Sequence, residues 1–419
     1  MAKDGSYSKK AIIGIIGMLI FGTGTMISSK LMFDTTACPI YYEDENPGIP
    51  KWEHGECPPY TVKKFEKPWY QTAIMFMAMS FCIFGHIFNI WYDKKKAAKF
   101  AALEAEQGLA DGEGYKSDVV HHDWKAYTYI GVPSLFDMAA TTVMGYGLEL
   151  IDVSIMQMLR GAMVVFATCF NIWFLKRKIR PYQWASVGVT VVALVLVGTS
   201  CLLGSAGDTS AEPWDVQLLG CFLVIISTAI QASQIVVEDL LLSNIKAAPL
   251  QIVGMEGIWG TVVTCAICWP IIMYLIPGSD HGAMEDIADT FYMFADNYLI
   301  VVFSIIYFIS ILFLNWSGMV VTQETSSVVR TIFEAVRTAA IWVVDLLIYY
   351  VFYPYSVYGE SWNTYSWLQL AGFILLIFGS QCYNAYARFR FFDYGDGYQK
   401  IVAKEDGTLN DGYIGETLE

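Results

Sequence analysis

Residues 298–320 read YLIVVFSIIYFISILFLNWSGMV, a run of 23 residues without an acidic or basic side chain. A helix of roughly 20 mainly apolar residues crosses a hydrocarbon core of about 30 Å, so this run predicts a transmembrane helix. Similar windows recur along the whole chain. The ten predicted spans are 10–33, 69–92, 126–148, 153–175, 182–204, 216–240, 250–274, 298–320, 329–352 and 366–387. We therefore expect an all-α polytopic membrane protein.

The overall composition supports the same class. Of 419 residues, 55% are hydrophobic and only 16% are charged, whereas soluble globular chains carry about 25% charged residues. The formal net charge of −14 comes mainly from loops and the C-terminal tail, where acidic side chains keep a segment solvated. The sequence has no basic face and no catalytic or metal-ligand motif. We expect no nucleic-acid partner, no enzymatic activity, no cofactor and no metal.

The basic residues are distributed unevenly between the loops, and cytoplasmic loops of membrane proteins retain such residues. Most of them lie in the segments on one side of the membrane, whereas the loops on the other side hold only Lys51, Lys63, Lys64 and Lys67. This asymmetry predicts an even number of spans and two cytosolic termini. The expected divisions are a cytosolic N-terminus (1–9), a first five-helix repeat (10–204) with a lumenal loop (34–68) and a cytosolic loop (93–125), a lumenal linker (205–215), a second five-helix repeat (216–387) and a cytosolic acidic tail (388–419).

The long loop 34–68 contains two cysteines, Cys38 and Cys57, among several prolines. In an oxidising lumen these thiols would form a disulfide that holds the loop as a cap over the first repeat. The alternative is a pair of free thiols, because pairing does not follow from sequence alone.

An internal repeat relates the two halves of the chain. The segment QMLRGA, which contains Arg160, resembles EAVRTA, which contains Arg337, at an offset of 177 residues. A polar residue precedes each arginine in the previous span, Asp137 by 23 residues and Asn315 by 22. Five helices per repeat is an odd number, so the second copy must enter the membrane from the opposite face. We therefore expect two inverted five-helix repeats, as in many secondary transporters.

Several strings of the sequence together resemble the drug/metabolite transporter superfamily, and within it the solute carrier 35 group, subfamily F. They are Phe136-Asp137-Met138, Met156 to Ala162, Gln183-Trp184, Gly254-Met255-Glu256-Gly257, and Arg330 followed by Glu334 to Thr338. The resemblance implies ten helices in two inverted repeats, a central cavity and alternating access. Some members of the wider group exchange nucleotide sugars, but no substrate follows for this branch.

Polar residues inside the predicted spans are the candidates for a substrate cavity. An ionisable side chain at the bilayer centre costs about 2.5–3.5 kcal/mol on insertion scales, so it normally faces a cavity or a partner. Arg160 and Arg337 would hold a carboxylate or phosphate, unless Arg337 only pairs with Glu334 along its own helix. Desolvated carboxylates such as Asp137 would also take up protons. The candidate cavity residues are Asp137, Gln157, Arg160, Glu256, Asn315, Glu334 and Arg337.

These observations predict a secondary-active transporter that moves a small polar or anionic solute across an intracellular membrane. The alternatives are a Golgi-type nucleotide-sugar antiporter and a membrane scaffold or sensor without flux. The expected partners are the solute and the lipid bilayer, with a proton as a candidate coupling ion and the oligomeric state left open. The tail segment 398–401, YQKI, matches a tyrosine-based endolysosomal sorting pattern, which favours a lysosome or vacuole over the Golgi.

Overall fold

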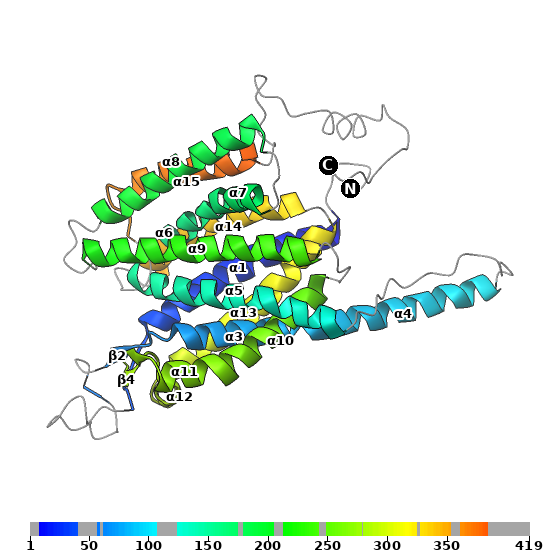
Figure 1. Ribbon diagram of the computed structural model, residues 1–419, viewed down its shortest axis with the longest axis horizontal. Helices are drawn as coiled ribbons and strands as arrows, with labels where there is room; N and C mark the ends of the chain where they lie inside the picture. The colour runs from blue at the N-terminus through cyan, green and yellow to red at the C-terminus, as the bar shows by residue number, and fades with distance from the viewer. Residues whose placement is uncertain are drawn as a thin grey trace.

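The computed structural model describes residues 8–40, 57–58, 62–106, 124–174, 179–204, 213–242, 249–278, 280–324, 327–352 and 361–383. The predicted acidic tail 388–419 and its segment 398–401 lie outside these residues, as do most of the predicted linker 205–215 and half of the loop 93–125. Long helices account for most of the described chain and run side by side in a bundle (Figure 1).

The helices in chain order are α1 (Lys9–Asp34), α3 (Pro68–Ser80), α4 (Cys82–Glu106), α5 (Trp124–Leu150), α6 (Val153–Leu159), α7 (Met163–Trp173), α8 (Pro181–Gly204), α9 (Trp214–Leu242), α10 (Pro249–Val263), α11 (Trp269–Tyr274), α12 (Ile287–Asp296), α13 (Tyr298–Glu324), α14 (Ser327–Leu347) and α15 (Ser366–Tyr383). A 3₁₀ turn, η1 (Arg160–Ala162), joins α6 to α7. Two π-helical segments, η3 (Thr264–Cys268) and η4 (Ile348–Phe352), follow α10 and α14.

Eight helices in the described part of the chain are long and apolar enough to cross a membrane. They are Lys9–Asp34, Pro68–Lys96, Val153–Phe170, Pro181–Leu203, Trp214–Val237, Leu250–Tyr274, Tyr298–Val321 and Ser366–Tyr383. They coincide with eight of the ten predicted spans, as expected of an all-α polytopic membrane protein. The other two predicted spans, 126–148 and 329–352, fall on α5 and α14, which are interrupted by polar residues such as Asp137 and Arg337.

Close contacts between helices depend on small residues. The helix α10 packs on α3 through glycines at every third position, and at Gly257 and Gly260 there is no room for a Cβ against Ser80 and Phe76. Without a hydrophobic driving force in lipid, such close backbone approach is what allows membrane helices to associate. The other extensive pairs are α1 with α13, α5 with α9, and α8 with α15.

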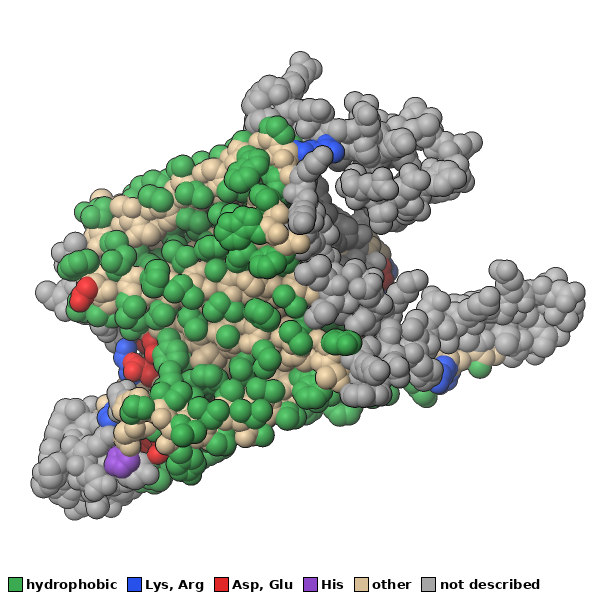
Figure 2. All heavy atoms as spheres, viewed as in Figure 1, with side chains coloured by type: hydrophobic (Ala, Val, Ile, Leu, Met, Phe, Trp, Pro, Cys, Tyr) green, Lys and Arg blue, Asp and Glu red, His purple; other side chains and the backbone are tan. Residues whose placement is uncertain are grey.

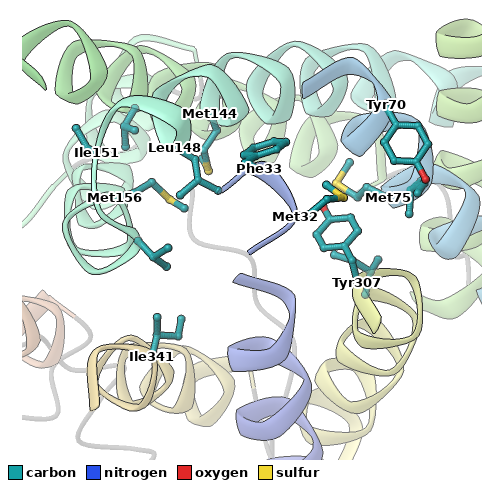
Figure 3. Close-up of a cluster of buried hydrophobic side chains, with 14 of the residues drawn as sticks. Met32, Phe33, Tyr70, Met75, Met144, Leu148, Ile151, Met156, Tyr307 and Ile341 are labelled. Carbon is teal, nitrogen blue, oxygen red and sulfur yellow. The ribbon is translucent and has the colours of Figure 1, made fainter. Parts of the chain in front are cut away.

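The bundle has an apolar interior and an apolar flank. Figure 3 shows part of the interior, where side chains from α1, α3, α5, α6, α13 and α14 meet. On the outside, large apolar side chains such as Ile20, Val195 and Phe222 are more than half exposed. Figure 2 shows apolar side chains over the described flank of the bundle, with charged side chains toward its ends. A continuous apolar flank of this kind fits hydrocarbon, not water.

One end of the bundle carries a small folded cap, which we call the capped end and define as residues 35–40, 57–58, 62–67 and 277–297 without 279. Two short antiparallel ribbons lie there, β1 (Thr36–Ala37) with β2 (Lys63–Lys64) and β3 (Pro277–Gly278) with β4 (Gly282–Ala283). Figure 1 shows β2, β4, α11 and α12 together at this end. Cys38 and Cys57 form a disulfide with their Cα atoms 5.6 Å apart, so the predicted disulfide is confirmed.

Candidate functional site

The first predicted arginine lies where its helix changes geometry. The α6 helix ends at Leu159, and the 3₁₀ turn that begins at Arg160 contains Gly161, which packs so closely against Leu376 of α15 that a Cβ would not fit. The backbone N–H of Met163 donates to the carbonyl oxygens of both Arg160 and Gly161. A 3₁₀ stretch inside a longer helix often marks a functional hinge. Arg160 therefore lies at the break between α6 and α7.

The Arg160 side chain has partners on four other helices. Its Nη2 donates to Oε1 of Gln231 on α9 at 3.2 Å. Its strongest electrostatic neighbours are Arg337 and Glu334 on α14, Asp137 on α5 and the Tyr307 hydroxyl on α13. The structure thus brings four of the seven predicted cavity residues together: Asp137, Arg160, Glu334 and Arg337. We call Asp137, Arg160, Gln231, Tyr307, Glu334 and Arg337 the interior cluster.

Arg160 is half-buried, so part of its surface stays accessible to solvent. The two arginines and two carboxylates of the interior cluster carry formal charges that sum to zero. A bound group would therefore meet both guanidinium donors and carboxylate acceptors there.

Arg337 is the least satisfied member of the interior cluster. Its side chain is buried, and its aliphatic stem packs against Gly22 of α1, where a Cβ would overlap it. Its Nε has no hydrogen-bond partner in the structure. A buried polar group left without a partner costs about 1–3 kcal/mol, and more when it is charged. A buried donor without a partner therefore requires an explanation, and a ligand that accepts a hydrogen bond from it is one.

The other three predicted cavity residues have different surroundings. Gln157 is buried in α6 and its Nε2 lies 3.7 Å from the sulfur of Met156. Asn315 donates from Nδ2 to the Ile311 carbonyl of its own helix at 3.0 Å. Glu256 is buried on α10 and is not among the strongest electrostatic neighbours of Arg160. Their assignment to a cavity stays a prediction.

Tyr307 belongs to the interior cluster although sequence reasoning did not select it. Its hydroxyl accepts a hydrogen bond from Gln71 Nε2 at 3.4 Å, and the same amide donates to Ser29 Oγ at 2.6 Å. Figure 3 shows Tyr307 among the apolar residues of the core. A tyrosine in an apolar span resembles any aromatic core residue, so the sequence offered no signal beyond its position two helical turns before Asn315.

A second group of buried charges lies at the capped end. Lys67 Nζ forms ion pairs with Asp280 and, at 3.0 Å, with Asp289. Burial alone would lower the pKa of Lys67, but the two carboxylates outweigh it and raise that pKa above its usual value. The group consists of Lys67 and three carboxylates within ten residues of one another, Asp280, Glu285 and Asp289. Lys67 is 213 residues from Asp280, and from the sequence alone it was counted only as a loop charge.

Glu285 completes the charged group at the capped end. Its carboxylate accepts hydrogen bonds from the backbone N–H groups of Trp69 and Tyr70, both at 2.8 Å, at the start of α3. Burial raises the pKa of Glu285 to about 7, although the two N–H donors and Lys67 act in the opposite direction. The helix N-terminus favours the charged carboxylate, whereas the dry surroundings favour the neutral one.

The fold and the interior cluster define a polytopic membrane protein with a charged interior, which is the general organisation of membrane carriers. Residues 67–199 match the model of the EamA-like transporter family. Member F6 of solute carrier family 35 is 34% identical over 261 residues in Rattus norvegicus and 33% identical over 261 residues in Homo sapiens. Each match covers 61% of this chain and 66% of the relative.

A more distant relative is covered more completely. An uncharacterised protein of Schizosaccharomyces pombe, C12G12.12, is 30% identical over 284 residues, which are 67% of this chain and 81% of the relative. The chain therefore belongs to the drug/metabolite transporter superfamily and to its solute carrier 35 group, close to subfamily F. The match spans just under two thirds of the length of the solute carrier relatives. A crystal structure that is 14% identical has a TM-score of 0.42, too low for a shared fold to be inferred.

Proposed function

We propose that this protein is a secondary-active transporter that moves a small polar or anionic solute across an intracellular membrane by alternating access. The observation that carries the proposal is the interior cluster, in which two guanidinium groups from different halves of the chain lie near each other in the bundle. Membership of the solute carrier 35 group supports transport as the activity. The rest of the proposal is built from the described contacts.

The pattern of helix packing supports ten spans in two inverted repeats. Taken in chain order, α1, α3, α5, α7 and α8 of the first repeat correspond to α9, α10, α13, α14 and α15 of the second. The contact of α1 with α13 then has its counterpart in α9 with α5, and α1 with α14 in α9 with α7. The contact of α3 with α13 likewise corresponds to that of α10 with α5. Exchanging the two repeats maps the pair α3–α10 onto itself, and the pair α8–α15 onto itself, and both pairs are in contact. A two-fold relation of this kind is expected of inverted repeats.

The chemistry of the interior cluster suits a solute that carries an anionic group. Guanidinium groups bind carboxylate and phosphate in a planar, two-pronged geometry. The Nε of Arg337 is a free donor for such a group, and Arg160 Nη2 is already oriented by Gln231. Asp137 and Glu334 would accept hydrogen bonds from amino or hydroxyl groups of the same solute. A small molecule with both kinds of group would satisfy the interior cluster best.

We propose that the capped end faces the lumen and that both termini face the cytosol. The disulfide supports this orientation, because such bonds persist in oxidising compartments and are rare in the cytosol. The scarcity of basic residues in the loops of this end agrees with it. A lysosomal or vacuolar membrane is favoured over the Golgi, as argued from the tail sequence.

The first experiment identifies the solute and tests the role of the arginines. Purified full-length protein is screened by thermal shift against carboxylates, phosphates, amino acids and nucleotide sugars, since a ligand of the native state raises the melting temperature. Compounds that stabilise the protein are then measured for uptake into proteoliposomes. Arg160→Ala and Arg337→Ala should abolish the uptake, while Arg180→Ala, which removes an arginine at the start of α8, should not.

The outcomes separate the competing functions. Normal uptake by both interior variants would refute the anion-binding role of the interior cluster. Stimulation of uptake by a nucleoside monophosphate on the opposite side would establish a nucleotide-sugar antiporter. Protein that is stabilised by no compound and transports none would favour a scaffold or sensor.

A further inference from the structure

A third group of charged side chains lies apart from both groups described above. Lys30 lies one turn before the C-terminal end of α1, Asp152 is the N-cap residue of α6, and Asp345 is on α14. Asp345 interacts electrostatically with both Asp152 and Lys30, and Asp152 with Lys30. The three residues therefore form one cluster, to which each half of the chain contributes a carboxylate.

Lys30 is fixed at this position by the end of a neighbouring helix. Its Nζ donates to the carbonyl oxygens of Leu148 at 3.0 Å and Ile151 at 3.5 Å, at the C-terminal end of α5. Free carbonyl groups at a helix C-terminus attract a cation. Lys30 is also 3.9 Å from Asp34, which lies 3.5 Å from Lys64. The Lys30 ammonium group thus has several partners and does not form an exclusive ion pair with Asp152 or Asp345.

Asp152 does not perform the usual task of an aspartate at its position. Aspartate at an N-cap normally accepts a hydrogen bond from the first turn of the helix, but the Asp152 side chain makes no such bond. Its side chain is exposed to solvent. The surrounding protein raises the pKa of Asp152, and the nearby Asp34 adds to this effect while Lys30 opposes it.

Asp345 supplies the independent observation that points to a ligand. Only 5% of its surface is exposed, and its Oδ2 has no hydrogen-bond partner. Burying an ionised carboxylate there costs free energy, because both of its oxygens need hydrogen-bond donors and neither oxygen can donate. With both aspartates ionised and one lysine, this cluster keeps a net charge of −1. A single proton would make it neutral and would turn one carboxyl into a donor.

We infer that Asp152 and Asp345, together with Lys30, form a proton-binding site next to the capped end of the bundle. Asp345 is almost fully buried, and a second carboxylate near it disfavours its ionised form, so the two groups share a proton. The α6 and α14 helices pack against each other, so loss of the proton would add repulsion between the two halves at this end. A role of this site in coupling proton movement to transport rests on the proposed function. Proton binding itself does not depend on that function.

The charged groups that face the site from the neighbouring elements also have to be considered. They are Lys30 and Asp34 on α1, Lys64 on β2 and Glu149 on α5, which itself interacts with Lys30, Lys64, Glu66 and Glu285. None of these is replaced in the variants below. Their contributions to pH dependence are therefore common to wild type and variant, and cancel in the difference between them.

The test uses the purified full-length protein in detergent and needs no solute. Melting temperatures of the wild type, Asp345→Asn and Asp152→Asn are measured between about pH 5 and about pH 8, with Asp215→Asn at the exposed start of α9 as the matched control. A shared proton stabilises the native wild type at low pH and is lost as the pH rises. Asp345→Asn keeps a neutral side chain, so its melting temperature should exceed that of the wild type by about 2–4 °C at high pH and equal it at low pH.

A second readout detects the proton directly. Infrared spectra of the same samples should show the C=O band of protonated carboxyls in the wild type and in Asp215→Asn, and Asp345→Asn should lose part of this band, keeping only the contribution of other protonated carboxyls such as Glu285. If Asp345→Asn does not fold, Asp152→Asn serves instead, because its side chain is solvent-exposed. Wild-type behaviour of the Asp345 or Asp152 variant in both readouts would overturn the inference.

Replacing choline chloride by sodium or potassium chloride at equal ionic strength distinguishes a proton from a metal cation. Equal melting temperatures in the three salts are expected, and specific stabilisation by one of the metal ions would overturn the assignment to a proton. Failure of the protein to transport any solute would refute the proposed function but would change neither readout.

Discussion

The capped end and the interior cluster both bury charge, but they satisfy it differently. At the capped end, Lys67 pairs with two aspartates, and Glu285 accepts two backbone hydrogen bonds at 2.8 Å. In the interior, Arg160 donates one hydrogen bond to a side chain at 3.2 Å, and Arg337 Nε has no partner. Fully paired buried charges hold segments of the chain together, whereas partly paired ones remain available to a ligand.

The capped end also connects segments that are far apart in the chain. The capped end joins the loop after α1 to the region between β3 and α13, since Cys38 N–H donates to Asp296 at 2.7 Å and Ile40 N–H to Asp289 at 2.7 Å. Asn297 Nδ2 donates to the Thr36 carbonyl at 2.8 Å. These contacts fasten the two halves of the chain to each other on one side.

The largest effect should follow from Lys67→Ala. The substitution leaves Asp280 and Asp289 without their buried cation, and breaking a buried ion pair in this way costs about 3–5 kcal/mol. Thermal unfolding of the purified protein would measure the loss. Lys63→Ala, which removes an exposed lysine four residues earlier, is the control and should melt like the wild type. If both variants melt alike, the capped end is not stabilised by its ion pairs.

The next effect concerns the disulfide between Cys38 and Cys57. The two cysteines are 19 residues apart, and a loop of this size gives a stabilisation of about 3 kcal/mol in the chain-entropy model. The double substitution Cys38→Ser and Cys57→Ser should lower the melting temperature under non-reducing conditions and remove the response to dithiothreitol. A wild-type protein that melts at the same temperature with and without reductant would contradict this expectation.

A smaller, pH-dependent effect is expected from Glu285. Because its pKa is raised to about 7 in the folded protein, its contribution to stability is present at low pH and is lost as the pH rises through about 7. The full contribution is of the order of 3 kcal/mol. Glu285→Gln, which keeps an oxygen acceptor for Trp69 and Tyr70, should lose less stability than the wild type between about pH 5 and about pH 8. An unchanged pH dependence in this variant would show that Glu285 is ionised throughout.

Features that depend on neighbouring residues could be predicted from the sequence, whereas contacts between residues far apart in the chain could not. Membrane spans follow from local hydropathy, so eight of the ten predicted spans coincide with apolar helices. The remaining two contain the polar residues of α5 and α14, and there hydropathy is a weak guide because polar side chains can face a protein interior. The disulfide was predicted correctly because both cysteines lie in one loop of an apparently lumenal character.

The paired charges of the capped end were missed for the opposite reason. Lys67 and Asp280 are 213 residues apart, and nothing in the local sequence of either residue indicates the other. Asp152 was missed because an aspartate before a helix normally reads as a cap. The interior arginines were found because the internal repeat aligned Arg160 with Arg337, although their assignment as substrate ligands stays a prediction.

The smallest effect on stability, and the sharpest contrast with Lys67→Ala, is expected from Arg337→Met. Replacing a poorly paired buried charge by an apolar side chain of similar length is often neutral or stabilising, so the unfolding free energy should change by less than about 1 kcal/mol. Binding of an anionic solute should nevertheless weaken at least about tenfold, because a hydrogen bond to a charged group is worth about 1.5–3 kcal/mol. Melting curves with and without a compound from the thermal-shift screen measure both quantities in one experiment. A variant that melts several degrees below the wild type and still binds the compound normally would mean that Arg337 serves the fold, and the distinction between the two regions would then fail.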